Sequence, residues 1–197
     1  MISFVTIGMV WLGGVGGVEK PAGEHPQANA IHVVCHGKLR HGLVAIGGET
    51  TGTTITFDGM TWELKLPDEA SRRFAQEQHK QHVTVTGRLR RVGGVEIPNR
   101  WVVDAEKLTK REMKAVDEKA EVTITGQLPV TTGKALPKSI DVGGESWPVV
   151  WGDRPDLHSQ AASLAGKAVV AQGTAEANTE GGPKKYPIFH IQQLHAK

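Results

Sequence analysis

Alternation of apolar and polar residues is the dominant pattern along this chain. Between residues 31 and 40 the two classes alternate almost without a break. Successive side chains of an extended strand point to opposite faces, so this pattern predicts a strand with one buried face. The inward set is Ile31, Val33, Cys35, Gly37 and Leu39, and the outward set is His32, Val34, His36, Lys38 and Arg40. A shift of one residue would bury the charged side chains, which fixes this choice of faces.

Turn and cap signals predict the next elements. Asp58-Gly59 separates two apolar-polar segments, 53–57 and 60–66, and is a strong signal for a tight hairpin. Asp68 then stands where an N-cap would begin a helix that runs to about His79.

A second pair of strands is predicted around Gly93-Gly94, with one strand over Gln81–Arg91 and the other over Val95–Val103. The first half of the chain is therefore expected to run strand, strand, strand, helix, strand, strand.

The second half of the chain repeats this order. Ile31–Leu39 aligns with Ala120–Leu128, Asp58–Leu64 with Gly143–Val149, His82–Gly87 with Ala168–Gly173, and Val103–Leu108 with Phe189–Leu194. A helix matching the first is expected near Asp156–Ala165, before Gly166. Four anchors that recur in the same order and at nearly the same offset predict an internal duplication.

Five strands with a helix between the third and the fourth resemble the OB-fold barrel. The resemblance lies in order and spacing over 31–109 and 121–196. It implies an all-β fold with minor helix: two tandem five-stranded OB-like barrels, each with a helix between strands three and four. We expect the first barrel at 31–109, a charged helical linker at 110–120 and the second barrel at 121–197.

The N-terminal segment resembles a secretory signal peptide. Residues 2–12 are almost wholly apolar and small residues follow at 13–17, although no Lys or Arg precedes them. We expect a signal peptide at 1–17, a leader at 18–30 and export to the periplasm or the cell exterior. The alternative is an apolar first strand in a cytoplasmic protein. No later segment reaches the ~20 apolar residues of a membrane span.

The assignment of strand faces predicts that the cysteine and the tryptophan side chains lie in the core. Cys35 aligns with Ile124, which makes it a small core residue rather than a reactive thiol. Trp62 and Trp147 lie on inward faces, and each is expected to fill its own barrel. Trp101 shares its face with apolar neighbours and is expected in the core as well.

Three histidines of the first barrel are a weaker candidate site. His32 and His36 share a strand face and His41 follows them, whereas Cys35 points to the other face. Zinc sites usually take three or four protein ligands. A metal-binding protein or metal-dependent enzyme that uses these histidines is therefore a second alternative, and we expect no metal and no cofactor.

Composition and motifs narrow the function further. The chain has 23 Lys+Arg against 21 Asp+Glu, and only 5% aromatic residues. This balance disfavours a strong electrostatic partner such as duplex DNA. The catalytic patterns G-x-S-x-G, P-loop and H-E-x-x-H do not occur. We therefore expect a protein that is not an enzyme.

The outer surface of the first barrel is the predicted ligand-binding region. Its candidate residues are Lys38, Arg40, Thr86, Arg88, Arg90 and Arg100. Because strands one and four of an OB-fold are antiparallel, Arg88 and Arg90 are expected near the start of strand one. That places them away from Lys38 and Arg40, so the cations are expected to be spread out.

These observations favour a non-catalytic binding or structural module, exported, whose partner is a protein or a polymer. The chain resembles uncharacterised exported bacterial proteins built from such domains. The alternative is a single-stranded nucleic acid binding protein, because OB barrels combine a basic groove with aromatic platforms. The inward-facing indoles argue against that alternative, so nucleic acid is disfavoured as a partner.

Overall fold

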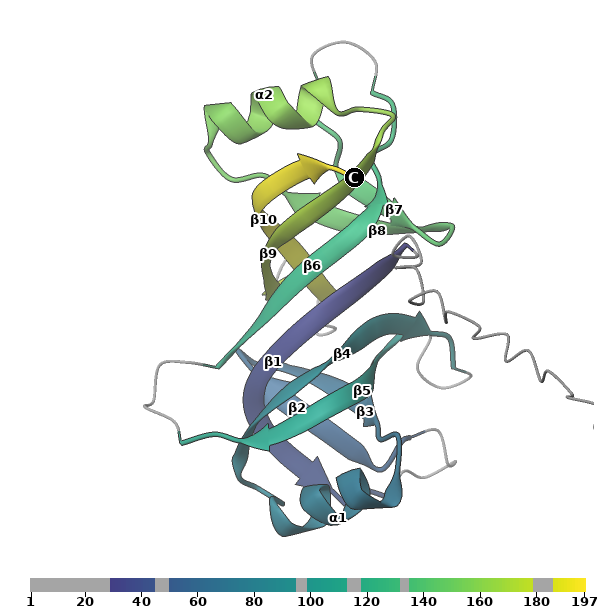
Figure 1. The fold of residues 1–197 in the computed structure, drawn as a ribbon, viewed down its shortest axis with the longest axis vertical. Helices are drawn as coiled ribbons and strands as arrows, with labels where there is room; N and C mark the ends of the chain where they lie inside the picture. Colours follow the sequence, from purple (N-terminus) through teal and green to yellow (C-terminus); the bar gives the residue numbers. More distant parts are fainter. Residues whose placement is uncertain (1–28, 45–49, 95–98, 113–117, 132–134, 179–185) are drawn as a thin grey trace, which may run out of the picture.

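The computed structural model describes residues 29–44, 50–94, 99–112, 118–131, 135–178 and 186–197. The predicted signal peptide and nearly all of the predicted leader lie outside the described residues. The fold is mostly strands, with two helices (Figure 1). In chain order the elements are β1 (Ala30–His41), β2 (Thr53–Phe57), β3 (Met60–Lys65), α1 (Glu69–Glu77), β4 (His82–Val92), β5 (Arg100–Lys110), β6 (Lys119–Gln127), β7 (Ser139–Val142), β8 (Glu145–Val150), α2 (Pro155–Ser163), β9 (Ala168–Asn178) and β10 (Tyr186–Ala196).

Strands β1 to β5 close into a five-stranded barrel. β1 pairs with β2 and β4, β2 pairs with β3, and β5 joins β3 to β4. Every pairing is antiparallel except β3 with β5, which is parallel. Helix α1 follows β3 and lies at one end of this barrel (Figure 1). The predicted closed barrel with a helix between strands three and four is therefore present.

The remaining strands continue the same sheet. β1 pairs antiparallel with β6, so that Ile31 lies opposite Ile124. From β6 the pairing runs to β9, then β10, β8 and β7. β7 also meets β6 through one residue pair, Gln127 with Asp141. β1 thus has three partners: β4 along one edge, and β6 followed by β2 along the other.

The local signals in the sequence act as predicted in the first barrel. Asp58 and Gly59 have φ values of 42° and 69°, the left-handed pair that a type I′ hairpin turn requires. The side chain of Asp68 accepts a hydrogen bond of 2.7 Å from the backbone N–H of Ser71, which confirms the N-cap. The turn at Asp58-Gly59 ends β2 and begins β3, and the cap at Asp68 fixes where α1 begins.

Two boundaries differ from the prediction. β5 is Arg100–Lys110 rather than 95–103, and residues 95–98 lie outside the described residues. The strand continues past Val103 and pairs with β4 as far as Lys110, which lies opposite Val83. The predicted helical linker also has strands at its ends, since Lys110 belongs to β5 and β6 begins at Lys119; residues 113–117 are outside the described residues.

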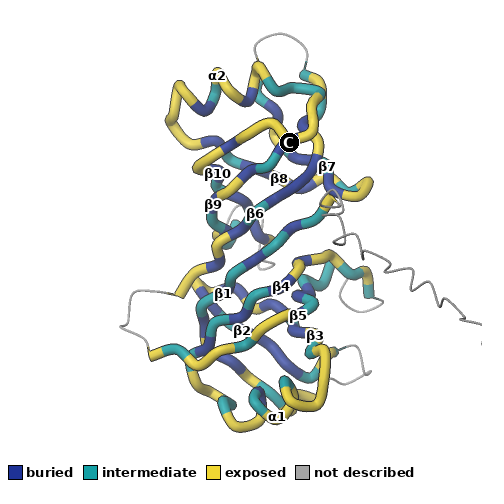
Figure 2. The backbone as a smooth tube through the Cα atoms, in the orientation of Figure 1, coloured by how far each residue is buried: buried dark blue, intermediate teal, exposed yellow. Residues whose placement is uncertain are grey.

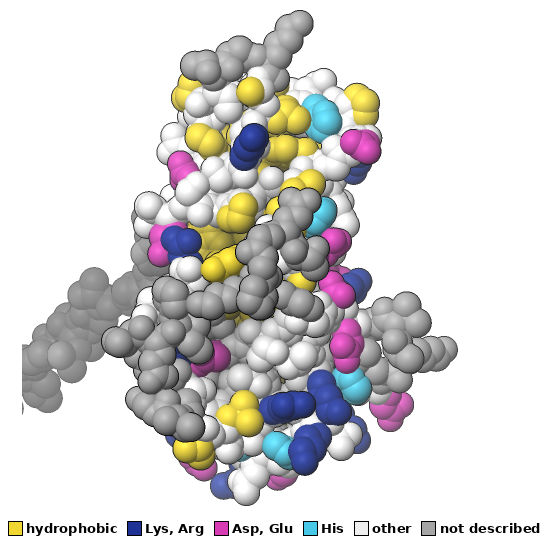
Figure 3. Space-filling model, turned by 180° about the vertical axis from the view of Figure 1, so that it is seen from behind, with side chains coloured by type: hydrophobic (Ala, Val, Ile, Leu, Met, Phe, Trp, Pro, Cys, Tyr) yellow, Lys and Arg dark blue, Asp and Glu magenta, His cyan; other side chains and the backbone are white. Residues whose placement is uncertain are grey.

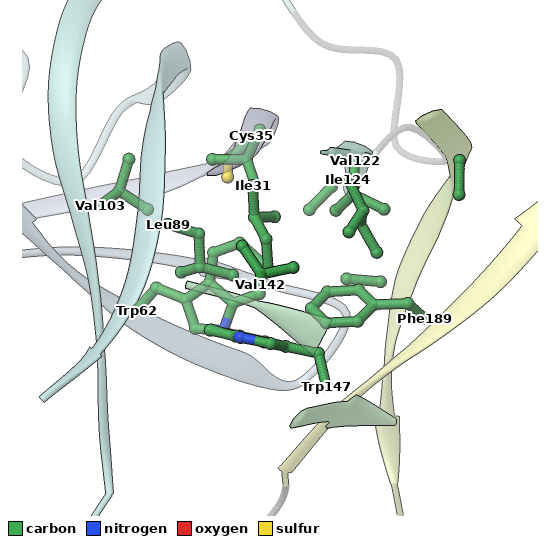
Figure 4. Packing of buried hydrophobic residues seen from close by; sticks show 14 of the residues in the cluster. Ile31, Cys35, Trp62, Leu89, Val103, Val122, Ile124, Val142, Trp147 and Phe189 are labelled. Carbon is green, nitrogen blue, oxygen red and sulfur yellow. The ribbon is translucent and has the colours of Figure 1, made fainter. Parts of the chain in front are cut away.

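The core is one continuous cluster that reaches through the junction of β1 and β6 (Figures 2 and 4). Cys35 is fully buried, as predicted, and burial raises the pKa of its thiol. Trp62 is buried edge-on against Phe57, with 4.8 Å between ring centroids.

Trp147 corrects the expectation that each indole fills only its own barrel. Its ring lies 5.8 Å from that of Phe189 on β10 and 5.3 Å from that of Trp101 on β5, centroid to centroid. Trp101 is half-buried rather than fully inside. The indole of Trp147 therefore joins the two halves of the chain. Neither helix among the described residues has the length and apolar character needed to cross a membrane.

Candidate functional site

The outer surface of β1, β2 and β3 carries two of the predicted cations. Lys38 and Arg40 are exposed at the end of β1, and their partners across the β1–β2 ladder are Thr56 and Thr54. On β3, Thr61 faces Thr56 with 3.1 Å between their hydroxyl oxygens. A pair of long cationic side chains thus borders a sheet surface lined with hydroxyl groups.

A third cation, Lys80, follows α1 and lies beside the same end of β1, along the edge that pairs with β4. The backbone N–H of Lys80 donates to the carbonyl of Leu39 at 2.8 Å, and the N–H of Leu39 donates to the carbonyl of Gln81 at 2.9 Å. Lys80 is exposed and has a φ of 65°. We call Lys38, Arg40 and Lys80 the basic surface. Lys80 was missed by the sequence analysis because it follows a helix, where alternation along a strand gives no signal.

Among the residues that the structure describes, none neutralises the cations of the basic surface. Lys38, Arg40 and Lys80 form no ion pair with any residue in the described part of the chain. On the face of the molecule drawn in Figure 3, Lys and Arg side chains gather over the half that contains β1 to β5. Basic charge is therefore concentrated locally, although the chain as a whole is nearly balanced.

Arg100, also a predicted site residue, is held in a structural pair. Its Nε and Nη2 donate to the two carboxylate oxygens of Glu63 at 2.7 and 2.6 Å. Only 13% of the Arg100 side chain and 15% of the Glu63 side chain are exposed. Burial on its own raises the pKa of Glu63, but hydrogen bonds from Arg100 and Thr51 outweigh it and hold that pKa below its usual value.

Arg88 and Arg90 are also paired with carboxylates. Arg88 Nε lies 3.3 Å from a carboxylate oxygen of Glu106, and Arg90 donates to both oxygens of Asp104 at 2.7 and 3.1 Å. Arg88 lies opposite His32, near the start of β1, as the antiparallel register predicted.

Thr86 lies opposite Val34, between the two ends of β1. Of the six predicted site residues, Lys38 and Arg40 are therefore the two cations that lie together and have no ion-pair partner within the described ranges.

Two of the three candidate histidines, His36 and His41, lie within hydrogen-bond distance of threonine hydroxyl groups. His36 Nδ1 lies 2.9 Å from Thr84 Oγ1, and His41 Nδ1 lies 2.7 Å from Thr53 Oγ1. Across the described residues, no group of three or more His, Cys, Asp or Glu side chains is arranged to hold a metal ion.

The outside of the sheet is hollowed at described residues of β6, β9 and β10, and again beside the β7–β8 hairpin. The first, of about 340 Å³, opens on β6, β9 and β10 and is lined by Lys119, Glu121, Val122, Thr123, Gln172, Gly173, Thr174, Gln192 and Gln193. The second, of about 370 Å³, lies where β1 and β4 meet the β7–β8 hairpin, and Trp147 lines it. Arg91 and Glu145 both line this second hollow, with 3.6 Å between Arg91 Nε and Glu145 Oε2.

Comparison with known proteins gives a match by structure. No protein-family model matches the sequence, and no curated protein does. The single-stranded DNA binding protein of Thermus aquaticus superimposes with a TM-score of 0.53 at 15% identity, covering 86% of this chain and 94% of that one. A deletion mutant of the same protein gives 0.51 at 14% identity, over 86% and 95%. The fold is OB-like. At this identity the likeness shows the fold alone.

The comparison corrects the expectation about partners. A protein or polymeric ligand was favoured and nucleic acid disfavoured, whereas both similar structures are single-stranded DNA binding proteins. The expectation rested on net charge and on the inward-facing indoles. Net charge says nothing about local distribution, and phosphate contacts do not require an aromatic platform. Neither description is of an enzyme.

Proposed function

We propose that this protein binds single-stranded DNA at the basic surface. The observation that carries the proposal is the position of Lys38 and Arg40 at the end of β1 beside β2, with Lys80 along the β4 edge of the same end. The faces of strands two and three are where OB barrels bind oligonucleotides. Lys and Arg side chains that neutralise phosphates release counterions, and this supplies most of the affinity of non-specific binding.

The surroundings of the basic surface suit contact with a phosphate backbone. Hydroxyl groups of Thr56 and Thr61 stand next to the cations, and such groups commonly donate to phosphate oxygens. The aromatic side chains of β2 and β3, Phe57 and Trp62, are buried in the core. Binding at this surface therefore rests on charge more than on stacking, and it is expected to depend steeply on salt.

We further propose that β1–β5 and β6–β10 are two copies of one OB barrel, with domains at 31–109 and 121–197. Equivalent glycines support this. A Cβ on Gly37 would lie 2.3 Å from the carbonyl oxygen of Thr56, and one on Gly126 would lie 2.5 Å from that of Asp141. In both halves the first strand crosses the second so closely that only glycine fits.

The fourth and fifth strands of the two halves share a second feature, a β-bulge. In β5 the register skips Glu106, between the partners of Thr86 and Gly87. In β10 it skips Gln192, between the partners of Gln172 and Gly173. Bulges are kept as designed features within related folds, and their recurrence at matching positions supports duplication.

A binding titration tests the proposed function. A fluorescently labelled oligo(dT) of about 20 nucleotides is titrated with the protein at about 50 and 200 mM salt, and anisotropy is read. Three neutralised phosphates predict affinity about 20-fold weaker at the higher salt, from the slope of about −0.7 per contact for single strands. No binding at the lower salt, or binding that salt does not change, overturns the proposal.

A further inference from the structure

The hollow on β6, β9 and β10 is lined by threonine and glutamine side chains, together with Lys119 and Glu121, which pair with each other at 2.8 Å between Nζ and Oε1. Thr123, Gln172 and Gln193 lie in one row across the three strands, as successive register partners. Thr174 and Gln192 are the other uncharged polar side chains of the lining. We call these five residues the glutamine pocket.

The amide groups of the pocket are available to a ligand. Gln172, Gln192 and Gln193 are exposed, and their side chains form no hydrogen bond with any described residue. Each amide carries a donor and an acceptor side by side. That pair matches the N6 and N7 edge of adenine, which glutamine reads with two hydrogen bonds.

The bulge gives the pocket its shape. Gly173 forms part of the lining, and a Cβ there would lie 1.9 Å from the carbonyl oxygen of His190, so the two strands approach closely. At the bulged residue, Arg154 Nη1 donates to the carbonyl oxygen of Gln192 at 2.9 Å. The extra residue is therefore held in place, and Gln192 and Gln193 both reach the rim.

The pocket is continuous with the basic surface along the outer face of the sheet. Lys119 lies in the same hollow, paired with Glu121, and is the register partner of His36. His36 is two residues from Lys38 on the same face of β1. β1, β6 and β9 lie side by side (Figure 1). From strand spacings, Lys38 and Gln172 are about 22 Å apart. A stacked strand covers that distance in about six or seven nucleotides.

We propose that a DNA strand bound at the basic surface continues over β1 and β6, and that an adenine base enters the glutamine pocket. This inference rests on the proposed function and adds a base preference to it. Phosphates are held on the first half of the chain, where charge supplies affinity. The glutamine amide groups on the second half of the chain form hydrogen bonds with the edge of the adenine base.

Substituted oligonucleotides test the inference. Oligo(dT) of about 20 nucleotides is compared with the same length carrying dA at every fourth position, which limits stacking within the free strand. One bidentate contact worth about 1 kcal/mol predicts roughly fivefold tighter binding of the dA-containing strand. The double variant Gln172→Ala/Gln193→Ala should lose this preference while keeping its affinity for oligo(dT) and its salt dependence.

The control is Gln76→Ala, since Gln76 is an exposed glutamine on α1, away from the pocket. It should keep the preference for dA. Equal affinity of the wild-type protein for both strands overturns the inference and leaves the proposed function standing, as does a preference that survives in the double variant. Absence of binding to both strands overturns the proposed function itself.

Discussion

Cys35 shows how far a single position can be predicted from alternation. It stands between two outward neighbours in β1, and it is fully buried while they are not. Because side chains change faces at every residue of a strand, knowing the side of Leu39 decided the side of Cys35. The same rule separated the thiol from the histidines on either side of it.

The buried thiol should be unreactive in the folded protein. Burial raises the pKa of Cys35 and removes the thiolate that attacks disulfide reagents. We expect no labelling by such a reagent at pH 8 within minutes, and full labelling of one thiol once urea unfolds the chain. Rapid labelling of the native protein would contradict the assignment of Cys35 to the core.

We expect the contribution of Glu63 to the stability of the fold to depend on pH. Its pKa is lowered in the folded state, so its contribution is present above the unfolded value and is lost as pH falls through the folded value. We expect Glu63→Gln to lower the free energy of unfolding by about 1–2 kcal/mol at pH 7. In urea titrations the difference from wild type should shrink below the usual carboxyl pKa of 4.5. A difference that stays constant down to pH 3 would exclude this role.

The residue pattern did not reveal the ion-pair partners of Arg88 and Arg90. Alternation placed Arg88 and Arg90 outward, which is correct, but the predicted end of the next strand at Val103 left Asp104 beyond it. The observed β5 continues and places Asp104 and Glu106 across from them. An error of a few residues at a strand boundary therefore turned two neutralised arginines into apparent ligand-binding residues.

At the scale of strands, the closest contacts are made at glycines. Gly87 and Gly173 lie beside the bulges, and a Cβ on either would meet a backbone carbonyl oxygen, of Asp104 or His190, at 2.3 or 1.9 Å. Backbone cannot move aside as a flexible side chain can. Sequence alignment of the two halves matched these glycines with each other. It did not reveal the bulges, because a bulge depends on the register of two strands.

We expect Gly87→Ala and Gly173→Ala each to lower the free energy of unfolding by about 1–3 kcal/mol, as overpacking usually does. Urea titrations monitored by circular dichroism measure this loss of free energy of unfolding. Thr86→Ala is the matched control, since it changes the neighbouring residue on the outer face and should alter stability by less than about 1 kcal/mol. Two glycine variants as stable as wild type would argue against these close crossings.

For the whole molecule, the junction between the halves is the feature that repeat analysis could not predict. Two aligned copies indicate two similar units but say nothing of how the units meet. In the structure β1 and β6 form a ladder of seven residue pairs, and Trp147 packs on Trp101 across the junction. The core is consequently shared, which ties the stability of one half to that of the other.

A shared core predicts that the chain unfolds in one transition. Urea unfolding curves from tryptophan fluorescence and from far-ultraviolet circular dichroism should superimpose. Trp147→Ala should move both curves together to lower urea, by an amount equivalent to about 3–5 kcal/mol. Two separated transitions in the wild-type protein would show that the halves fold independently and that the junction contributes little.

The most direct test of the account is the salt dependence of DNA binding in the double variant Lys38→Ala/Arg40→Ala. Loss of two phosphate contacts should flatten the slope of log Kobs against log salt by about 1.4 for a single strand. Arg88→Ala/Arg90→Ala is the matched control and should leave the slope nearly unchanged, because those arginines are already paired with Glu106 and Asp104. A slope unchanged by the first substitution, or flattened more by the second, would contradict binding at the basic surface.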